Sequence, residues 1–318
     1  MSEQNCPLCN STHVERIDRV FTDDIVALYD QVLTVDVKEY FSDTEFLEYY
    51  RCKECGLFSF IPSIVGDSLF YQRLNMFNWY YLPEKYEFKY CSQHIPLGAR
   101  VLDIGCGAGA FKGSLPGRDY VGLEPHGESD PVSKESVLHM DIDQFLATQP
   151  ELFDAVCVFQ VLEHLKSPGD FIQRALSCLK PGGGFVVSTP SQDSFIGNVT
   201  NSPLAMPPHH MSHWPDSAFR QMTRFNLELE ELHHEPLQDI HVPWFSSKFC
   251  EEQLKEQHPE GCKGGLIDMS PGFKALAEEA EKMAKQVTPI FSNPAWRPVG
   301  HTVIAVFTKK IVAGSVEA

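Results

Sequence analysis

The 318-residue chain is acidic, with a formal net charge of -17, and 43% of its residues are hydrophobic. That apolar content suits a folded core, while the net negative charge disfavours nucleic acid or an anionic membrane surface as the main partner. The first residues lack the basic-then-apolar order of a signal peptide, and no apolar run reaches the roughly 20 residues of a membrane span. We therefore expect a cytoplasmic protein, of unspecified oligomeric state.

Residues 1–65 contain two C-x-x-C pairs, Cys6 with Cys9 and Cys52 with Cys55. In a reducing compartment this pattern favours a metal over disulfides, because each turn lets two thiolates converge on a tetrahedral ion. The spacing predicts a zinc-ribbon module with an inserted loop. Four thiolates would close the coordination sphere, so the Zn²⁺ ion is expected to be structural. The alternatives are four free thiols or a redox C-x-x-C motif.

Residues 66–95 are aromatic and helical in tendency, and they are expected to form a lid or linker. From residue 96 to 318 the pattern alternates between strands and helices, which predicts an α/β domain with a parallel sheet. The expected strands are 100–104, 120–123, 137–140, 154–159 and 185–188, followed by late strands at 238–242 and 301–308. The segment 190–215 interrupts the alternation and is expected to be a substrate loop.

A glycine-rich turn follows the first strand of this domain. Gly105, Gly107 and Gly109 allow a tight turn and a close approach of the backbone to a ligand, although such a turn can also serve structure alone. Two acids, Glu124 and Asp141, end the second and third strands. Carboxylates at these places can accept hydrogen bonds from a ribose or from an adenine amino group.

With the Leu-Lys-Pro-Gly-Gly-Gly turn at 179–184, these motifs resemble the class I S-adenosylmethionine-dependent methyltransferases over roughly residues 80–190. The branch most similar contains the ubiquinone-type O-methyltransferases and the sugar methyltransferases. The rival, an NAD-binding domain, has the fingerprint G-x-G-x-x-G instead. The resemblance implies a Rossmann-like, doubly wound, seven-stranded sheet whose last strand is antiparallel.

The resemblance also implies S-adenosylmethionine as the cofactor and assigns its contacts. The glycines and Asp103 would surround the methionine portion, and Glu124 would hold the ribose. The remaining contacts would come from Asp141 and Ile142 at the adenine, from Phe159 and Gln160 after the fourth strand, and from Tyr80 or Tyr81 at the carboxylate. Core packing is the alternative for Phe159, and packing between the ribbon and the catalytic domain is the alternative for the tyrosines.

The loop sequence Pro-Pro-His-His-Met-Ser-His-Trp at 207–214 lies after the fifth strand, at the ligand-binding edge of an open α/β sheet. His210 is predicted to be the acceptor's base, with His209 as the fallback. Solvent-facing histidines and a metal site are the alternatives. The ubiquinone group is thought to hold a metal near an extra glutamate, which is Gln160 here, so Glu163 and His164 are expected to be helix-start and packing residues.

The expected function is methyl transfer to an oxygen or carbon of a small polar metabolite, such as a sugar or an aromatic biosynthetic intermediate. A zinc-ribbon-containing RNA methyltransferase or RNA-binding adaptor is the alternative from a different class. A catalytically silent cofactor-binding domain is disfavoured by the complete motif from Asp103 to Gly109 together with Glu124.

Overall fold

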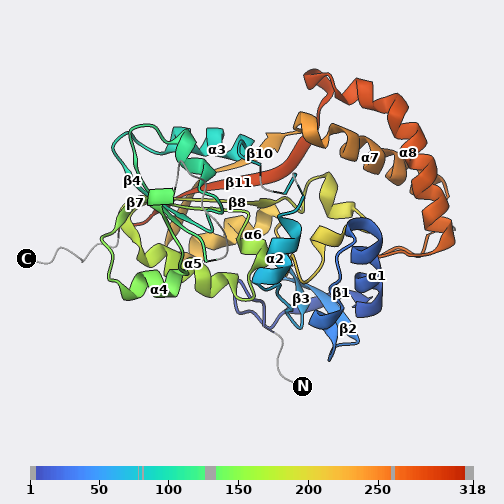
Figure 1. Ribbon diagram of the computed structural model, residues 1–318, viewed down its shortest axis with the longest axis horizontal. Coiled ribbons are helices and arrows are strands. Elements are labelled where there is room, and N and C mark those ends of the chain that lie inside the picture. The colour runs from blue at the N-terminus through green and yellow to red at the C-terminus, as the bar shows by residue number, and fades with distance from the viewer. Residues whose placement is uncertain (1–4, 78, 81, 126–133, 259–261, 312–318) are drawn as a thin grey trace, which may run out of the picture.

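The computed structural model describes residues 5–77, 79–80, 82–125, 134–258 and 262–311 (Figure 1). A seven-stranded sheet has the strand order β10-β11-β8-β7-β4-β5-β6. Its strands are β4 (Arg100–Ile104), β5 (Asp119–Leu123), β6 (Val137–Leu138), β7 (Phe153–Phe159), β8 (Leu179–Pro190), β10 (Leu227–Pro236) and β11 (Val299–Lys309). The last strand, β11, runs antiparallel to both of its neighbours. The Rossmann-like architecture with an antiparallel last strand is therefore confirmed.

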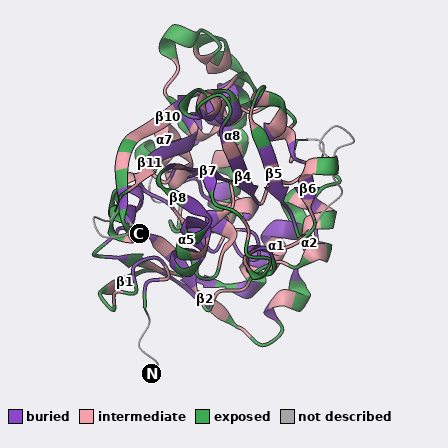
Figure 2. Ribbon diagram, turned by 90° about the vertical axis from the view of Figure 1, so that its left-hand side faces the viewer, coloured by how far each residue is buried: buried purple, intermediate pink, exposed green. Residues whose placement is uncertain are grey.

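Helices cover both faces of this sheet, with α3 on one face and α4, α5 and α6 on the other. The helices of the described residues are α1 (Thr22–Leu33), α2 (Ser68–Leu74), α3 (Tyr86–Cys91), α4 (Ile142–Ala147), α5 (Pro168–Ser177), α6 (Asp216–Gln221), α7 (Val242–Gln257) and α8 (Pro271–Phe291). Alternate residues of β7 point to opposite faces. Val156 and Val158 join the core beneath α4, α5 and α6, whereas Cys157 and Phe159 join the core beneath α3. Figure 2 shows the central strands β4, β7 and β8 largely buried between these layers.

The N-terminal unit has its own four-stranded sheet. Its strands are β1 (Val14–Phe21), β2 (Phe46–Cys52), β3 (Phe58–Ile61) and β9 (Ser212–His213), in that order. Helix α1 packs on the sheet through a separate core that includes Ile25, Leu28 and Phe60. Strand β9 belongs to the loop 190–215, so the predicted substrate loop completes the sheet of the N-terminal unit. The amino-acid sequence did not predict this pairing of β9 with β3.

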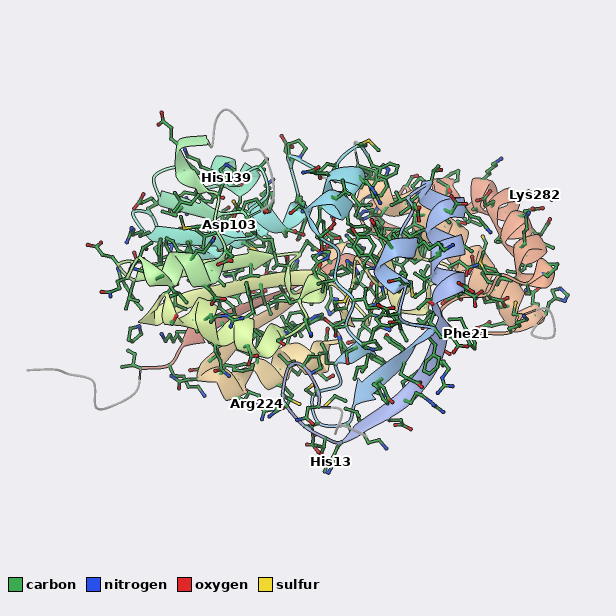
Figure 3. The ribbon with its side chains drawn as sticks, turned by 60° about the horizontal axis from the view of Figure 1, so that its bottom comes forward. His13, Phe21, Asp103, His139, Arg224 and Lys282 are labelled. Atoms are coloured by element: carbon green, nitrogen blue, oxygen red, sulfur yellow. The ribbon has the colours of Figure 1, made fainter. Side chains whose placement is uncertain are left out.

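Helices α7 and α8 form a protruding pair next to β10 and β11 (Figure 1), and pack together through Cys250, Ala280 and Ala284. Figure 3 shows how far Lys282 of this pair lies from Asp103 in the central sheet. The predicted strand at 238–242 is wrong. A 3-10 turn (Asp239–His241) leads there into α7, whose first turn contains Pro243, a residue that suits helix starts. The strand lies upstream, where residues 227–236 pair with β11. Across the described residues, the helices lack the length and apolar character that would cross a membrane.

Candidate cofactor and acceptor site

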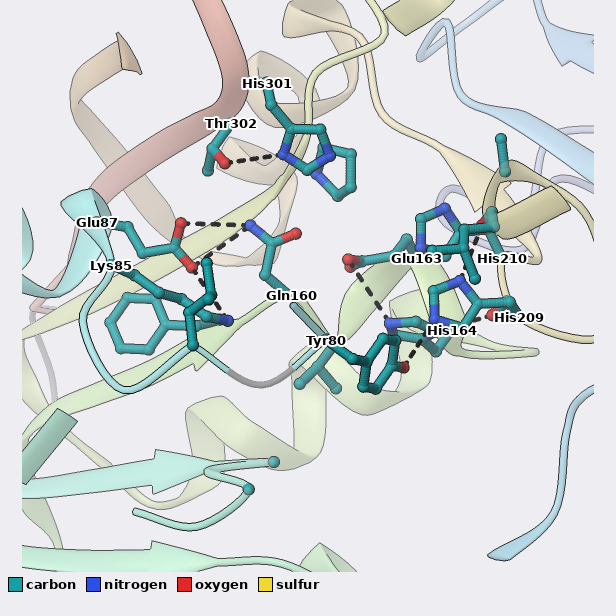
Figure 4. Close-up of a pocket in the computed structure, with 18 of the residues that line it drawn as sticks. Tyr80, Lys85, Glu87, Gln160, Glu163, His164, His209, His210, His301 and Thr302 are labelled. Carbon is teal, nitrogen blue, oxygen red and sulfur yellow. Dashed lines mark hydrogen bonds and ion pairs between the residues drawn. The ribbon is translucent and has the colours of Figure 1, made fainter. Parts of the chain in front are cut away.

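A cavity of about 1480 Å³ opens at the carboxyl edge of the large sheet. Pockets for drug-sized ligands usually have about 300–1,000 Å³, so this cavity has room for two ligands side by side. Its lining combines the glycine turn, the aromatic segment around Tyr80, the residues after β7, the loop 190–215 and the start of α7. Figure 4 shows part of this lining.

The glycine turn has the conformation that its sequence predicts. Gly105, Gly107 and Gly109 have φ angles of 74°, 54° and 79°, in the left-handed region that favours glycine. A Cβ atom on Gly105 would also collide with the Val161 side chain. The backbone N–H groups of Gly105 and Cys106 donate to the Leu123 carbonyl at 2.8 and 3.0 Å, which ties the turn to β5.

Two buried carboxylates stand beside this turn. Glu124 is 8% exposed, and its Oε2 accepts a hydrogen bond from the Gly107 N–H at 2.9 Å. Asp103 is 2% exposed and accepts a hydrogen bond from the Tyr120 hydroxyl at 2.8 Å. Burial raises the pKa of Asp103 to about 7. The structure thus brings together the predicted glycines, Asp103 and Glu124 at one end of the cavity.

Asp141 and Ile142 lie where β6 leads into α4, and both line the cavity. The Asp141 side chain caps α4 by accepting a hydrogen bond from the Gln144 N–H at 2.8 Å. The Gln144 side chain in turn accepts from the Asp141 N–H at 3.0 Å, which completes a capping box. Asp141 therefore has a structural task at the position where the sequence predicts an adenine contact.

The two predicted residues after β7 have different surroundings. Phe159 packs against Phe111 and Phe88, with ring centroids 4.8 and 5.4 Å away, in agreement with the packing alternative. Its edge still lines the cavity. Gln160 has a φ angle of 55°, and its amide nitrogen lies 3.4 Å from both carboxylate oxygens of Glu87. The Gln160 side chain is therefore oriented toward Glu87.

The aromatic segment meets the histidine loop. The Tyr80 hydroxyl lies 2.8 Å from Nε2 of His209, so the structure places this tyrosine at the histidine end of the cavity. Tyr81 lies outside the described residues. Both sequence alternatives, a lid and a packing element, are compatible with the position of Tyr80 between the two units.

The histidine loop is fixed by backbone hydrogen bonds to both units. The Met211 N–H donates to the Glu163 carbonyl at 2.7 Å, and the Met211 carbonyl accepts from the Phe60 N–H at 3.0 Å. His209 and His210 stack with ring centroids 4.4 Å apart. Burial lowers the pKa of both histidines well below the usual value, so both are neutral near pH 7.

Several polar and aromatic lining residues were not predicted as functional. They are Lys85, Glu87, Glu163, His164, Glu235, His241, Trp244 and His301. Glu87 is 3% exposed, and its carboxylate lies 3.9 Å from the Lys85 ammonium. Burial raises the pKa of Glu235 to about 7. Of these residues, only Glu163 and His164 could have been singled out from the sequence, because they lie just after β7, where the predicted cofactor contacts also lie. The other residues lie in segments that are distant in sequence from the predicted site.

The four predicted zinc ligands come together. Their sulfur atoms lie within 4.8 Å of one another, and all four side chains are buried. The Sγ–Sγ distance is 3.5 Å for Cys6 and Cys55, and also for Cys9 and Cys52. The turn between Cys6 and Cys9 packs on α5, where the Gly169 N–H donates to the Pro7 carbonyl at 3.1 Å. The cysteine cluster therefore contacts the catalytic domain as well as its own sheet.

Comparison with known proteins gives a family match. The family described as "Methyltransferase domain" matches residues 80–256. A ubiquinone biosynthesis O-methyltransferase of Xylella fastidiosa (strain 9a5c) is 37% identical over 112 residues, which are 31% of this chain and 46% of that protein. A protein of the same name from Bradyrhizobium sp. (strain ORS 278) is 39% identical over 101 residues, 29% of this chain and 40% of that protein. The chain thus spans less than half the length of these relatives.

Among solved structures, a crystal structure of coclaurine N-methyltransferase bound to N-methylheliamine and SAH aligns with a TM-score of 0.40 and 14% identity. The alignment covers 69% of this chain and 70% of that one.

Proposed function

Because the chain belongs to the methyltransferase domain family, we propose that it transfers the methyl group of S-adenosylmethionine to an oxygen or carbon of a small polar metabolite. A sugar or an aromatic biosynthetic intermediate is the proposed acceptor class. The observation that carries the proposal is the pairing of the Gly107 N–H with the Glu124 carboxylate, 2.9 Å apart, at the edge of the cavity. This arrangement suits a nucleoside with ribose hydroxyls and a neighbouring positive sulfonium.

The proposed cofactor contacts follow from this placement. Glu124 accepts hydrogen bonds from the ribose, while Asp103 and the glycine turn face the methionine portion. Asp141 and Ile142 border the adenine, and Phe159 and Gln160 border the methyl end. Tyr80 closes the cavity from the histidine side. Apart from Gly109, which is not among the lining residues, these residues line one continuous cavity, which supports a single bound cofactor with an acceptor next to it.

The transfer is an in-line displacement. The bond between the methyl carbon and sulfur breaks with its electron pair remaining on sulfur, while the acceptor atom forms a new bond to the methyl carbon. The acceptor's proton passes to His210, or to His209 as the fallback. Their place at the far end of the cavity supports this role, and so does their neutrality near pH 7, since only a neutral imidazole can accept a proton. The protein's contribution is to hold the two reactants in line.

We also propose that residues 1–65 form a zinc-binding unit with one structural Zn²⁺ ion. Zinc–sulfur bonds of about 2.3 Å in a tetrahedron separate the sulfurs by about 3.8 Å, close to the two observed distances of 3.5 Å. The four cysteines thus fit a closed tetrathiolate site.

Calorimetry with S-adenosylmethionine and S-adenosylhomocysteine tests the cofactor assignment directly. We expect both to bind the folded protein at one site per chain. Incubation of the protein with S-adenosylmethionine and panels of hydroxylated aromatics and sugars, followed by mass spectrometry, would then identify the acceptor. Failure of both cofactor forms to bind a folded sample would refute the proposal.

A further inference from the structure

We infer that the acceptor end of the cavity contains a second metal site, formed by His164, His209 and His210 and suited to a borderline transition cation such as Zn²⁺. Each ring offers a nitrogen, and the three nitrogens lie within 4.8 Å of one another. The ring centroids are 4.5 Å apart for His164 and His209, 4.9 Å for His164 and His210, and 4.4 Å for His209 and His210. Figure 4 shows the three rings gathered on one side of the cavity.

The hydrogen bonds of two rings leave their Nε2 atoms as acceptors. Nδ1 of His164 lies 2.8 Å from the His209 carbonyl, and Nδ1 of His209 lies 2.8 Å from the Leu204 carbonyl. A carbonyl only accepts, so each Nδ1 carries the proton and each Nε2 is an acceptor. Nε2 of His209 accepts from the Tyr80 hydroxyl at 2.8 Å, so a cation would replace that hydroxyl as its partner. Metal-bound histidines are commonly held in this way, with the second nitrogen donating to a backbone carbonyl.

Glu163 gives a second and independent indication. Its side chain is 1% exposed, and neither carboxylate oxygen has a hydrogen-bond partner among the described residues. One of these oxygens lies 3.7 Å from Nε2 of His164. A buried carboxylate without donors is costly. A cation in the histidine cluster would offset that cost.

The donor set selects the class of cation. Carboxylate and carbonyl oxygens suit Mg²⁺, whereas imidazoles suit zinc, copper and nickel. The carboxylate-rich ion site attributed to the ubiquinone group does not fit here, because Gln160 stands in place of the extra glutamate and its amide faces Glu87 at 3.4 Å. Zinc–nitrogen bonds of about 2.0–2.1 Å require ring nitrogens about 3.3 Å apart, so these rings need to close by at most about 1.5 Å.

Three protein ligands leave one tetrahedral position open, as in catalytic zinc sites. A bound divalent cation supplies Lewis acidity, which lowers the pKa of a hydroxyl group. This role of the site, unlike the binding itself, rests on the proposed function. With the cation in place, His210 serves as a ligand instead of a base, and an acceptor hydroxyl loses its proton to solvent before the methyl transfer.

Zinc content tests the binding without any cofactor or acceptor. The full-length protein is dialysed against micromolar zinc, and zinc per chain is measured by elemental analysis. We expect one ion at the cysteines and a second at the histidines. The double variant His164→Gln/His210→Gln should bind the second ion at least about 100-fold more weakly, since even outer-shell changes cost 10–100-fold. His94→Gln, outside the cavity lining, is the matched control.

The wild-type stoichiometry decides the inference even if the double variant fails to fold. A single zinc ion per chain, removed entirely by Cys52→Ser, would overturn it. So would retention of the second ion by a folded double variant, with folding checked by S-adenosylhomocysteine binding. Millimolar magnesium should not displace the second ion, and displacement would overturn the assignment of a borderline cation. If zinc binds twice but S-adenosylmethionine does not bind, the proposed function fails while the metal site stands.

Discussion

The two ends of the cavity are built in different ways. The end at the glycine turn comes mainly from residues 103–125 and 134–142, in which a strand, a glycine turn and the ends of the next two strands follow one another. The end at the histidine loop is assembled from side chains of separate segments, including 79–80, 82–87, 160–166, 201–213, 235–244 and 301–302. We call these the cofactor end and the acceptor end, after the proposed function. At the first end the backbone hydrogen bonds join segments that are close in sequence, whereas at the second end they join the histidine loop to the distant N-terminal unit.

Because of this difference, changes in distant parts of the chain should affect the two ends differently. Backbone-based contacts with glycines depend on local conformation, so they survive changes in distant parts of the chain. The acceptor end depends on the N-terminal unit, because the Phe60 N–H and Gly66 N–H donate to carbonyls of the histidine loop at 3.0 and 2.8 Å. We therefore expect perturbations to act on one end at a time, and the following experiments test that separation.

Loss of the structural zinc should have the largest effect, and only at the acceptor end. Zinc binding to small folded units is worth on the order of 10 kcal/mol, so Cys55→Ser should unfold the N-terminal sheet. Hydrogen exchange should then accelerate in β1, β2, β3 and β9, while β4 and β5 keep their protection. Cys262→Ser, outside the cluster, is the control. Equal acceleration in β4 would contradict the proposed separation.

In protein without a cation at the histidine cluster, His210→Ala should lower turnover by about 10²–10⁴-fold, the range for loss of a catalytic proton acceptor, and should leave S-adenosylhomocysteine affinity unchanged. The reason is its position at the acceptor end, stacked on His209 at 4.4 Å. Initial rates with an identified acceptor and calorimetry with the product cofactor give the two readouts. Normal turnover in both His210→Ala and His209→Ala would remove these histidines from the reaction.

Glu124→Ala should weaken S-adenosylmethionine binding at least about tenfold, or about 1.4 kcal/mol, because two charge-assisted hydrogen bonds to the ribose are lost. The same substitution at Glu281, an exposed lining residue on α8, should leave the affinity unchanged. Calorimetry on both folded variants makes the comparison. Unchanged affinity in Glu124→Ala would exclude Glu124 as the ribose contact.

The smallest effect concerns pH. Burial raises the pKa of Asp103 to about 7, far above its usual value of 3.8, so the native state binds a proton more tightly than the unfolded state. Its contribution to stability is therefore lost as pH rises through 7, by about 1 kcal/mol between pH 6 and 7. The buried histidines, with lowered pKa values, act with the opposite sign in this range.

The measurement is the difference in unfolding free energy between wild type and Asp103→Asn, taken at both pH values so that the histidine terms cancel. We expect wild type to lose stability relative to the variant as pH rises. A constant difference would show that Asp103 titrates normally in the folded protein.

From the sequence alone, the residues that gather at the glycine turn can be predicted more readily than those around the histidine loop, for a physical reason. Gly105, Gly107 and Glu124 lie close together in sequence, just after the ends of two consecutive strands, so local rules are enough to bring them together. Phe159 packs in the core and also lines the cavity, because the apolar end of a strand suits both roles. By contrast, Glu235, Trp244 and His301 reach the cavity only through the pairing of β10 with β11 and the helix that follows, which no short-range pattern encodes. The wrong prediction of a strand at 238–242 concerns the same region.

The pairing of β9 with β3 has a consequence for engineering. The short strand Ser212–His213 continues directly from the histidine loop, and the Tyr49 hydroxyl of β2, the strand beyond β3, lies 2.6 Å from Nδ1 of His213. The first 65 residues and the loop therefore form one exchangeable block. Replacing the loop alone would remove the strand that pairs with β3, whereas replacing residues 5–65 together with the loop would exchange β9 and its matching sheet edge in one step.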